Sequence, residues 1–401
     1  MNRSEWRTTG ALSSIYALRM FGMFMVLPVL SLYARHLTPG VSGLEIGLAV
    51  GIYGLLQALL QVPLGVVSDR IGRKPVITIG LIVFAAGSVL AGWASSIAWL
   101  IAGRALQGAG AISSAASALL ADATRPQVRT QAMTILGAGM GASFLLALIA
   151  GPPLSGVIGV DGIFVLTGAL AALALPVLWR GVPNPPRLPA TPGAFRRAVS
   201  DPQLLRLDAG IFLLHTMMTA LFVAAPFVLQ QTLGLPGHRQ WEVYLPVLVA
   251  SIVPVFALIR RIEAAGRIRA AFIAAVLLLG LALAGAGLLH GSGDGFTIAL
   301  FMFFVAFNYL EGTLPSLISR RAPASGKGAA LGVYSTCQFL GGFAGGVLGG
   351  TLLTDFGAAG VFYAAGALAL PWLLIAAGLK PPPLMPHPAN DETSAEAARG
   401  V

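Results

Sequence analysis

Long apolar runs, separated by short polar stretches, follow one another along almost the whole chain. A helix of roughly 20 mostly apolar residues crosses the hydrocarbon core of a bilayer. Twelve runs reach that length, so the pattern predicts an all-α membrane protein with twelve transmembrane helices. They lie near 10–34, 44–67, 75–94, 97–121, 130–154, 161–180, 206–231, 241–261, 269–290, 295–318, 328–352 and 358–379.

A polar stretch divides the runs into two sets of six. The sequence RGVPNPPRLPATPGAFRRAVSDPQ is rich in Pro and Arg and cannot form a span. We therefore expect six-helix bundles at 1–180 and 206–380, joined by a linker at 181–205. The last segment, 381–401, has few large apolar residues and is expected to be a disordered tail.

Composition and charge agree with a membrane protein. Hydrophobic residues make up 56% of the 401 residues and charged residues 10%, against about 25% charged in a soluble domain. The tails and the even-numbered loops hold all but four of the 25 Lys and Arg. Basic loops lie on the cytoplasmic side, which predicts that both termini are cytoplasmic. The net charge of +10 is then expected to face anionic lipid, not nucleic acid.

Several kinds of chemistry are not expected. The single cysteine, Cys337, excludes an internal disulfide and a thiolate metal site. No phosphate-binding Walker loop, His-Glu-x-x-His or Gly-x-Ser-x-Gly motif is present, which argues against an ATP-driven pump and an enzyme. We expect no cofactor and no metal.

The loop between the second and third runs, GVVSDRIGRKPVI, is more specific than a basic loop needs to be. Gly65 permits close approach of a neighbouring helix, and Gly72 suits a turn with positive φ. The charged residues of this loop are Asp69, Arg70, Arg73 and Lys74. Their order, Gly-x-x-x-Asp-Arg-x-Gly-Arg-Lys, resembles the signature loop of the major facilitator superfamily.

Two further motifs resemble the same family. GRALQGAGA, with Arg104, Gln107 and Gly108, is similar to its fourth-helix motif. GAGMGASFLLALIAGPPLSG is similar to its fifth-helix antiporter motif. The matching positions are Gly151, Pro152 and Gly156, and the departures are Ala147 and Ser155. The segments LRMFGMFMVLPVLSLYA, LPSLISRRAP and GVYSTCQFLGG resemble the proton-coupled drug-efflux branch.

This resemblance implies the major facilitator fold. Two six-helix bundles would enclose a substrate cavity near the bilayer midplane and alternate its access. Asp69 is expected to face the start of the eleventh span near 326–328, where a helix N-terminus favours an acid. Arg73 is expected to pair with Asp122, so that the loop would latch the outward-facing state. The alternative is a solvated loop without a coupling role.

Few ionisable residues lie inside the predicted spans, where a charge costs at least about 2.5–3.5 kcal/mol. Glu311 is the candidate proton site, and it shares a helix face with Phe304, Asn308 and Pro315. His215 and Arg104 are the further candidates for proton coupling. The alternative for Glu311 is a structural hydrogen bond, and for His215 it is packing. Asp208 and Glu242 lie nearer span ends and are expected at the interface.

Polar and aromatic stripes are the candidates for a substrate cavity. Tyr53, Gln57 and Gln61 lie four residues apart on one helix face, and Tyr334 and Gln338 form a similar pair in the other half. The alternative is hydrogen bonding between helices. The remaining candidates are Arg19, Met23, Phe24, Met218, Phe222 and Asn308, and plain packing is the alternative for Met23 and Phe24. Arg19 would neutralise an acid, attract an anionic group or extend towards the interface.

The function expected from these patterns is a monomeric, multi-pass transporter of the bacterial inner membrane. It would export a small apolar or cationic compound in exchange for protons. The alternatives are a proton-linked uptake symporter and a sensor that binds a ligand without moving it. Small residues are dense in GAGMGAS (137–143) and GGFAGGVLGG (341–350), and close helix packing is expected at both.

Overall fold

The protein is described by a computed structural model that covers residues 1–184, 193–264, 267–323 and 326–380. Within these ranges the regular elements are helices. Their bounds are α1 (Arg3–Met25), α2 (Leu27–Leu37), α3 (Gly43–Ile71), α4 (Arg73–Gly92), α5 (Ile97–Ala109), α6 (Ser113–Asp122), α7 (Pro126–Gly181), α8 (Ala194–Ala198), α9 (Pro202–Leu233), η1 (Gly237–Arg239), α10 (Trp241–Ala264), α11 (Ile268–Leu288), α12 (Gly293–Arg321), α13 (Lys327–Ala367) and α14 (Ala369–Ala377). The predicted all-α class is confirmed.

The helices correspond to twelve passes once their breaks are taken into account. Seven are long and apolar enough to cross a membrane, or eight if α1 and α2, which meet at 45°, form one span. α7 turns at Gly159 (φ 75°) and α13 turns at Gly357 (φ 64°), so each contains parts of two spans. The two short helices α5 and α6 supply the fourth span, and α10 supplies the eighth.

Capping residues explain where the second set of spans begins. Asp201 accepts hydrogen bonds from the backbone N–H of Gln203 (2.7 Å) and Leu204 (3.3 Å), and Pro202 occupies the first helical position. α9 therefore begins inside the predicted linker 181–205, which also contains α8. Residues 185–192 of that linker and the predicted tail 381–401 lie outside the described residues.

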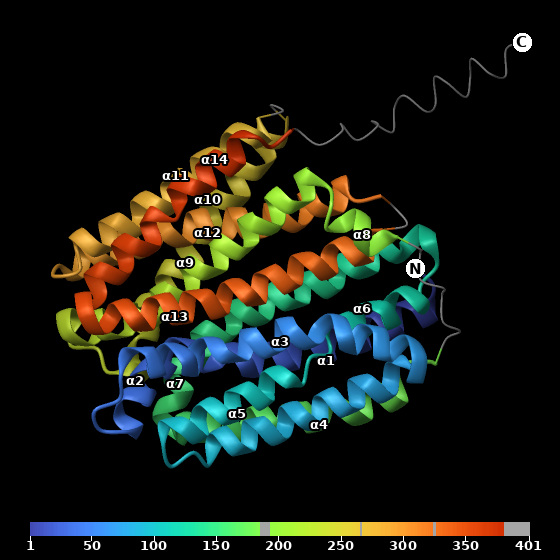
Figure 1. Cartoon of the computed structure of the whole chain (residues 1–401), viewed down its shortest axis with the longest axis horizontal. Coiled ribbons are helices and arrows are strands. Elements are labelled where there is room, and N and C mark those ends of the chain that lie inside the picture. Colours follow the sequence, from blue (N-terminus) through green and yellow to red (C-terminus); the bar gives the residue numbers. More distant parts are fainter. Residues whose placement is uncertain (185–192, 265–266, 324–325, 381–401) are drawn as a thin grey trace, which may run out of the picture.

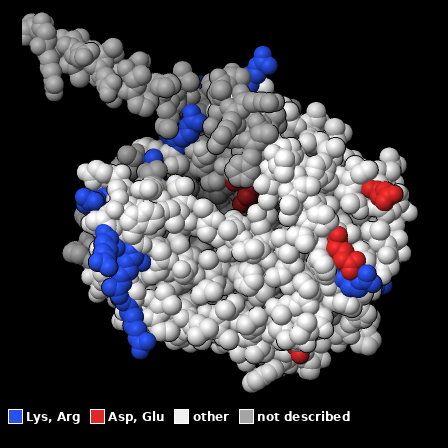
Figure 2. Space-filling model, turned by 180° about the vertical axis from the view of Figure 1, so that it is seen from behind, with Lys and Arg blue, Asp and Glu red and all other residues white. Residues whose placement is uncertain are grey.

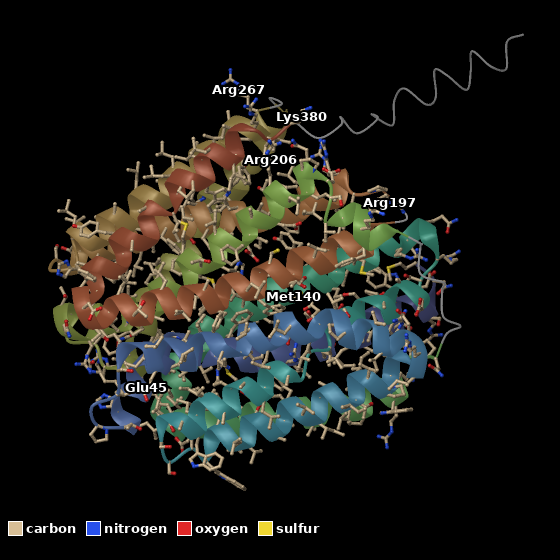
Figure 3. All side chains as sticks on the ribbon, viewed as in Figure 1. Glu45, Met140, Arg197, Arg206, Arg267 and Lys380 are labelled. Atoms are coloured by element: carbon tan, nitrogen blue, oxygen red, sulfur yellow. The ribbon has the colours of Figure 1, made fainter. Side chains whose placement is uncertain are left out.

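The first half of the chain, α1–α7, and the second half, α9–α14, lie on opposite sides of the molecule (Figure 1). α3 and α13 run side by side between them. Basic side chains gather at one end of the helices, as Figure 2 shows. We call this the basic end, because it carries Arg73, Lys74 and α8, and we call the opposite end the far end. Arg197 and Arg206 lie towards the basic end and Glu45 towards the far end (Figure 3).

The two halves are in backbone contact towards the far end. A Cβ atom added to Gly47 would meet the backbone of Gly346 and Gly350, and one added to Gly51 would lie 3.0 Å from the carbonyl oxygen of Phe343. Gly43 N–H also donates to Thr354 Oγ1 at 2.9 Å. The close packing predicted for 341–350 is confirmed, because small residues let the two helices touch.

Towards the basic end the packing between the halves is more open, although Gln61 of α3 still donates to the carbonyl oxygen of Gly332 of α13. A Cβ atom added at Gly328 or Gly332 of α13, or at Gly137 or Gly141 of α7, would have no neighbour within 4 Å. The close packing expected for 137–143 is therefore wrong at Gly137 and Gly141, because their faces border open space. Figure 2 shows a hollow on one side of the molecule with an acidic side chain inside it.

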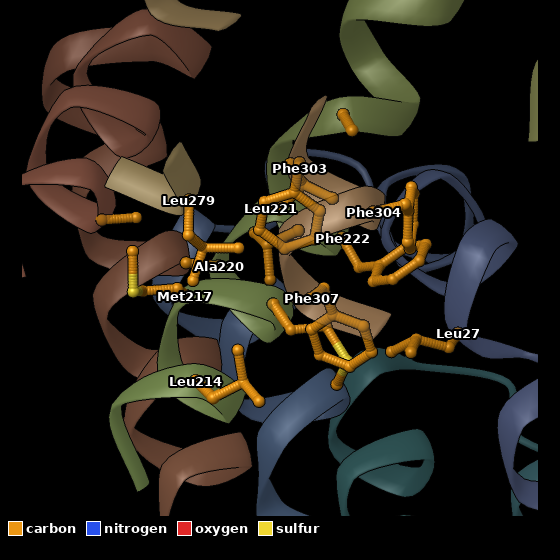
Figure 4. Close-up of a cluster of buried hydrophobic side chains, with 14 of the residues drawn as sticks. Leu27, Leu214, Met217, Ala220, Leu221, Phe222, Leu279, Phe303, Phe304 and Phe307 are labelled. Atoms are coloured by element: carbon orange, nitrogen blue, oxygen red, sulfur yellow. The ribbon is translucent and has the colours of Figure 1, made fainter. Parts of the chain in front are cut away.

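A large apolar cluster lies mainly in the second half of the molecule. Phe303 and Phe307 stack with ring centroids 5.9 Å apart, and Phe304 packs edge-on against Phe303 at 5.3 Å. Phe222 of α9 and Leu27 of α2 complete the same cluster (Figure 4). Because Leu27 belongs to the first half, the cluster also joins the two halves.

Candidate functional site

Three helices of the second half bring the acid, the imidazole and an amide together. Gln338 Nε2 of α13 lies 2.9 Å from His215 Nε2 of α9 and donates to Glu311 Oε1 of α12 at 3.3 Å. His215 Nε2 and Glu311 Oε2 are 3.9 Å apart. Glu311 Oε2 is buried and accepts no hydrogen bond from the residues that the structure describes. One carboxylate oxygen is thus free to take a proton.

Glu311 and His215 differ in how far their side chains are exposed. The Glu311 side chain is 35% exposed, whereas the side chain of His215 is 9% exposed. An amide with two N–H groups can donate to a carboxylate and to an unprotonated ring nitrogen at the same time. Gln338 therefore links the two ionisable groups directly, which the sequence did not predict.

A chain of aromatic rings leads from the first half to this group. Phe24 of α1 packs edge-on against Phe144 of α7 at 4.8 Å, and Phe144 lies 5.9 Å from Phe307 of α12. Phe307 in turn lies 6.1 Å from the His215 ring. Phe24 and Phe144 are half-buried. They continue an aromatic surface that ends at the His215 ring.

Arg19 is the centre of a buried polar network in the first half. Its Nη2 donates to Tyr53 Oη (2.8 Å), Gln57 Oε1 (2.7 Å) and the carbonyl oxygen of Gly110 (3.1 Å). Gln57 Nε2 continues the network to Ser113 Oγ at 3.1 Å. Arg19 is 1% exposed, so it does not extend towards the interface.

The polar stripe of the second span belongs to this network. Tyr53, Gln57 and Gln61 are 3%, 0% and 2% exposed. They therefore do not line open space in this structure, contrary to the predicted cavity. The alternative fits instead, because their polar atoms satisfy Arg19 and one another. Gln61 also donates across the halves to the carbonyl oxygen of Gly332 at 3.4 Å.

Arg104 lies apart from the proposed proton site. Its guanidinium donates to the carbonyl oxygens of Ala49 (3.2 Å) and Val50 (3.4 Å) and to Gln107 Oε1 (2.9 Å). It also stacks over the Tyr53 ring at 5.2 Å. Arg104 thus ties α5 to α3 within the first half. The structure does not bring it to Glu311 or His215.

Arg73 is the centre of the loop between α3 and α4. Its Nε donates to Asp122 Oδ2 at 3.1 Å, which is the predicted pairing, and its Nη1 lies 2.5 Å from Asp69 Oδ1. The side chains of Arg73 and Asp122 are 9% and 4% exposed, and that of Asp69 is 46% exposed. The predicted approach of Asp69 to the start of α13 stays a prediction, since open space lies beside Gly328.

The glycines and Lys74 of this loop anchor the neighbouring helices. Gly72 has φ 115°, which confirms the predicted turn, and a Cβ atom on Gly65 would collide with Ser114 of α6. Lys74 Nζ donates to the carbonyl oxygen of Val182 at 2.5 Å at the end of α7. Arg70 is exposed beside them.

The antiporter-like motif packs against the bend between α1 and α2 and against η1. A Cβ atom on Gly151 would meet the backbone of Met25, where α1 bends into α2, and Pro152 is buried beside it. A Cβ atom on Gly156 would lie 2.9 Å from the His238 side chain of η1. The motif therefore makes contacts within the first half and between the halves.

The other predicted cavity residues are mostly packed. Met23, Met218 and Phe222 are 6%, 3% and 0% exposed, so the packing alternative describes them in this structure. Asn308 Nδ2 donates to Ser251 Oγ at 2.9 Å. Tyr334 is 5% exposed, and its hydroxyl has no hydrogen-bond partner among the described residues.

Asp208 and Glu242, both expected at the interface, lie in different surroundings. Glu242 pairs with Arg239 at 2.7 Å on the surface. Asp208 is 3% exposed inside the second half, and its Oδ1 accepts no hydrogen bond from the described residues. Because α9 begins at Pro202, Asp208 lies in its second turn, and the interfacial position of both acids stays a prediction. A signal was present, since Asp208 precedes His215 by seven residues on one helix face.

Long apolar helices, buried ionisable groups and an opening between two halves define a polytopic membrane protein of the solute-transporting class. The family model of the Major Facilitator Superfamily matches residues 12–346 and 266–399. The chain belongs to that superfamily. Its relatives and structural neighbours are transporters, and it is a transporter and not an enzyme.

The relatives agree over most of the chain. It is 42% identical to the inner membrane transport protein YajR of Escherichia coli K12 over 392 residues, which cover 96% of this chain and 85% of YajR. It is 25% identical to the multidrug resistance protein MdtH of Shigella flexneri, covering 89% and 87% of the two chains. These relatives and the apolar helices support a multi-pass protein of the bacterial inner membrane.

A solved structure shares the fold. A bacterial homologue of the human lysosomal transporter Spinster, in an inward-facing and occupied conformation, superposes with a TM-score of 0.74. Its sequence is 17% identical, and the match covers 94% of this chain and 96% of that one. The predicted major facilitator fold is confirmed.

Proposed function

We propose that this transporter is proton-coupled and exports a small apolar or cationic compound by alternating access, working as a monomer without a cofactor. The observation that carries the proposal is the bridge from His215 through Gln338 to Glu311. The six-helix bundles at 1–180 and 206–380 would move against each other about this site. MdtH, named a multidrug resistance protein, supports an export role by its similarity.

Glu311 would couple proton transport to substrate transport, because the proton and the substrate compete for its carboxylate. A half-exposed carboxylate beside aromatic rings attracts either a proton or an organic cation, and it cannot hold both charges at once. Binding of the cation would therefore release the proton, and protonation would release the cation. The transporter would change between its inward- and outward-facing states more readily when the proton or the cation neutralises Glu311.

Orientation follows from the charges at the two ends. The positive-inside rule places the basic end in the cytoplasm, with both termini. The open space beside Gly328 would then correspond to an inward-facing state. In the opposite state the loop around Arg73 would approach the start of α13, where Asp69 would latch the closed cytoplasmic end.

A second candidate is a proton-linked symporter that takes up an anionic metabolite. Arg19 Nε and Nη1 are buried and have no hydrogen-bond partner among the described residues. A guanidinium with free N–H groups recognises carboxylate or phosphate. The known partners of Arg19 are neutral oxygens, so its charge is available to such a substrate.

The proposal is tested in proteoliposomes with an imposed pH gradient and ethidium as a fluorescent cationic probe. Glu311→Gln is expected to reduce gradient-driven ethidium movement by at least about 100-fold, because the group that exchanges protons is lost. Asp294→Asn is the matched control, since Asp294 is exposed at the start of the same helix. Wild-type transport by Glu311→Gln would rule out Glu311 as the proton site. Accumulation of an anionic probe with protons would favour the symporter.

A further inference from the structure

Asp208 is a buried carboxyl group that the proposed coupling does not use. It lies in the second turn of α9, is 3% exposed, and its Oδ1 accepts no hydrogen bond from the described residues. An ionised carboxylate in such a place has lost its hydration without a replacement, which strongly disfavours the charged form. Asp208 is therefore built to exist with a proton for at least part of a cycle.

The position of Asp208 relates it to the Glu311 site. It precedes His215 by seven residues, so the two share one face of α9 about 10 Å apart along the axis. α9 begins at the basic end, which places Asp208 between that end and the His215–Gln338–Glu311 group. Gly341 packs on Phe212, and Gly345 packs on Thr216. This contact holds α9 and α13 in parallel and in fixed register.

Tyr334 of α13 is a buried group near both carboxyl groups. It precedes Gln338 by one helical turn, and its buried hydroxyl has no hydrogen-bond partner among the described residues. Tyr334 interacts electrostatically with both Glu311 and Asp208. A hydroxyl group can accept one proton while it donates another, so it can connect two carboxyl groups.

The other groups around Asp208 leave it without a fixed countercharge. Cys337 of α13 interacts with it and is uncharged as a thiol. Arg206 lies two residues earlier on α9 and donates to the carbonyl oxygen of Gly378 at 2.9 Å. From α14 the neighbour of this turn is the Trp372 indole, which packs on Gly210. α12 contributes Glu311, which also interacts electrostatically with Tyr334.

We propose that Asp208 is a second proton-binding site and that it passes protons through the Tyr334 hydroxyl between the basic end and Glu311. In one transfer the Asp208 carboxyl gives its proton to the Tyr334 oxygen as the Tyr334 O–H proton moves to the Glu311 carboxylate. Two protons move, each to the next oxygen, so the net result is the transfer of one proton from Asp208 to Glu311, and no electrons are exchanged. The relay rests on the proposed role of Glu311, whereas proton binding at Asp208 does not.

The test follows carboxyl groups by infrared difference spectroscopy of the full chain in phosphatidylethanolamine–phosphatidylglycerol vesicles. A pH titration of the wild type is expected to show C=O bands from two buried carboxyl groups. Asp208→Asn removes one, Glu311→Gln removes the other, and Asp208→Glu shifts the first without removing it. Asp294→Asn, which changes an exposed carboxyl group, leaves both bands in place.

The relay is tested by a pH jump that starts from the basic end. The Glu311 band is expected to respond at least about tenfold more slowly in Asp208→Asn and in Tyr334→Phe than in the wild type. If Asp208 had a purely structural role, Asp208→Asn would remove no C=O band and would leave the response rate of the Glu311 band unchanged. If Asp208→Asn keeps both bands, or if the rate is unchanged, the inference is overturned. If Glu311→Gln keeps both bands, the proposed function is overturned instead.

Discussion

In the first half of the molecule the charges buried within the spans are the guanidinium groups of Arg19 and Arg104, whereas in the second half they are the carboxyl groups of Asp208 and Glu311. The two arginines donate to neutral oxygens of side chains and backbone. Each of the two carboxyl groups retains an oxygen that accepts no hydrogen bond among the described residues. Arginine keeps its charge in a protein, but a carboxyl group can lose it by taking a proton.

This difference distinguishes groups whose charge is fixed from groups whose charge can change. The positive charges of the first half hold helices together whatever the pH, and the acids of the second half are free to change state. Three aspartates make the comparison testable, because they share one chemistry in different surroundings. Asp122 is buried and paired, Asp208 is buried with an unpartnered oxygen, and Asp69 is exposed and paired.

The largest effect is expected at Asp122. Asp122→Asn removes the buried partner of Arg73, and it should lower the free energy of unfolding by about 3 kcal/mol. Thermal or denaturant unfolding of the detergent-solubilised protein measures this loss. Asp355→Asn, at an exposed position of α13, should change it by less than about 0.5 kcal/mol. Equal losses in both variants would mean that the Arg73–Asp122 pair contributes nothing specific.

The opposite sign is expected at Asp208. Asp208→Asn has the same shape but no charge to bury, so the free energy of unfolding should stay unchanged or rise by up to about 2 kcal/mol. The same unfolding measurement at neutral pH compares it directly with Asp122→Asn. A loss as large as that of Asp122→Asn would break the comparison, because it would indicate a strong partner for Asp208.

The smallest effect is expected at Asp69, whose ion pair with Arg73 is exposed to solvent. Asp69→Asn would weaken the closed state of the basic end by about 1 kcal/mol or less. In a Cys337→Ser background carrying Gly328→Cys, maleimide labelling of position 328 should then become a few times faster. Asp355→Asn serves again as the control. Unchanged labelling would argue for a solvated loop without a latch.

Much of the fold could be predicted because span length and charge asymmetry are properties of sequence alone. The third span, expected at 75–94, is α4 at Arg73–Gly92. The pairing of Arg73 with Asp122 was expected only from the resemblance to the major facilitator superfamily. The helix breaks at Gly159 and Gly357 were expected only as loops, and they turn with almost no intervening residues.

The site was predicted less completely, because periodicity identifies a helix face but not what that face meets. Tyr53, Gln57 and Gln61 do share one face, yet it packs on Arg19 and α6 and not on open space. The burial of Asp208 was not predicted, because it depends on the helices packed around α9. The bridge through Gln338 depends on three helices, and no single segment contains it.

The glycine contact between α3 and α13 has a consequence for the speed of the transport cycle. A seal made of long side chains would have to order many rotamers each time it closed, at about 0.5–2 kcal/mol of conformational entropy for each flexible side chain. Along Gly47, Gly51 and Gly346 the facing atoms are backbone, which is already ordered in both helices. If the proposed alternating access opens this contact, closing it again would require little ordering of side chains.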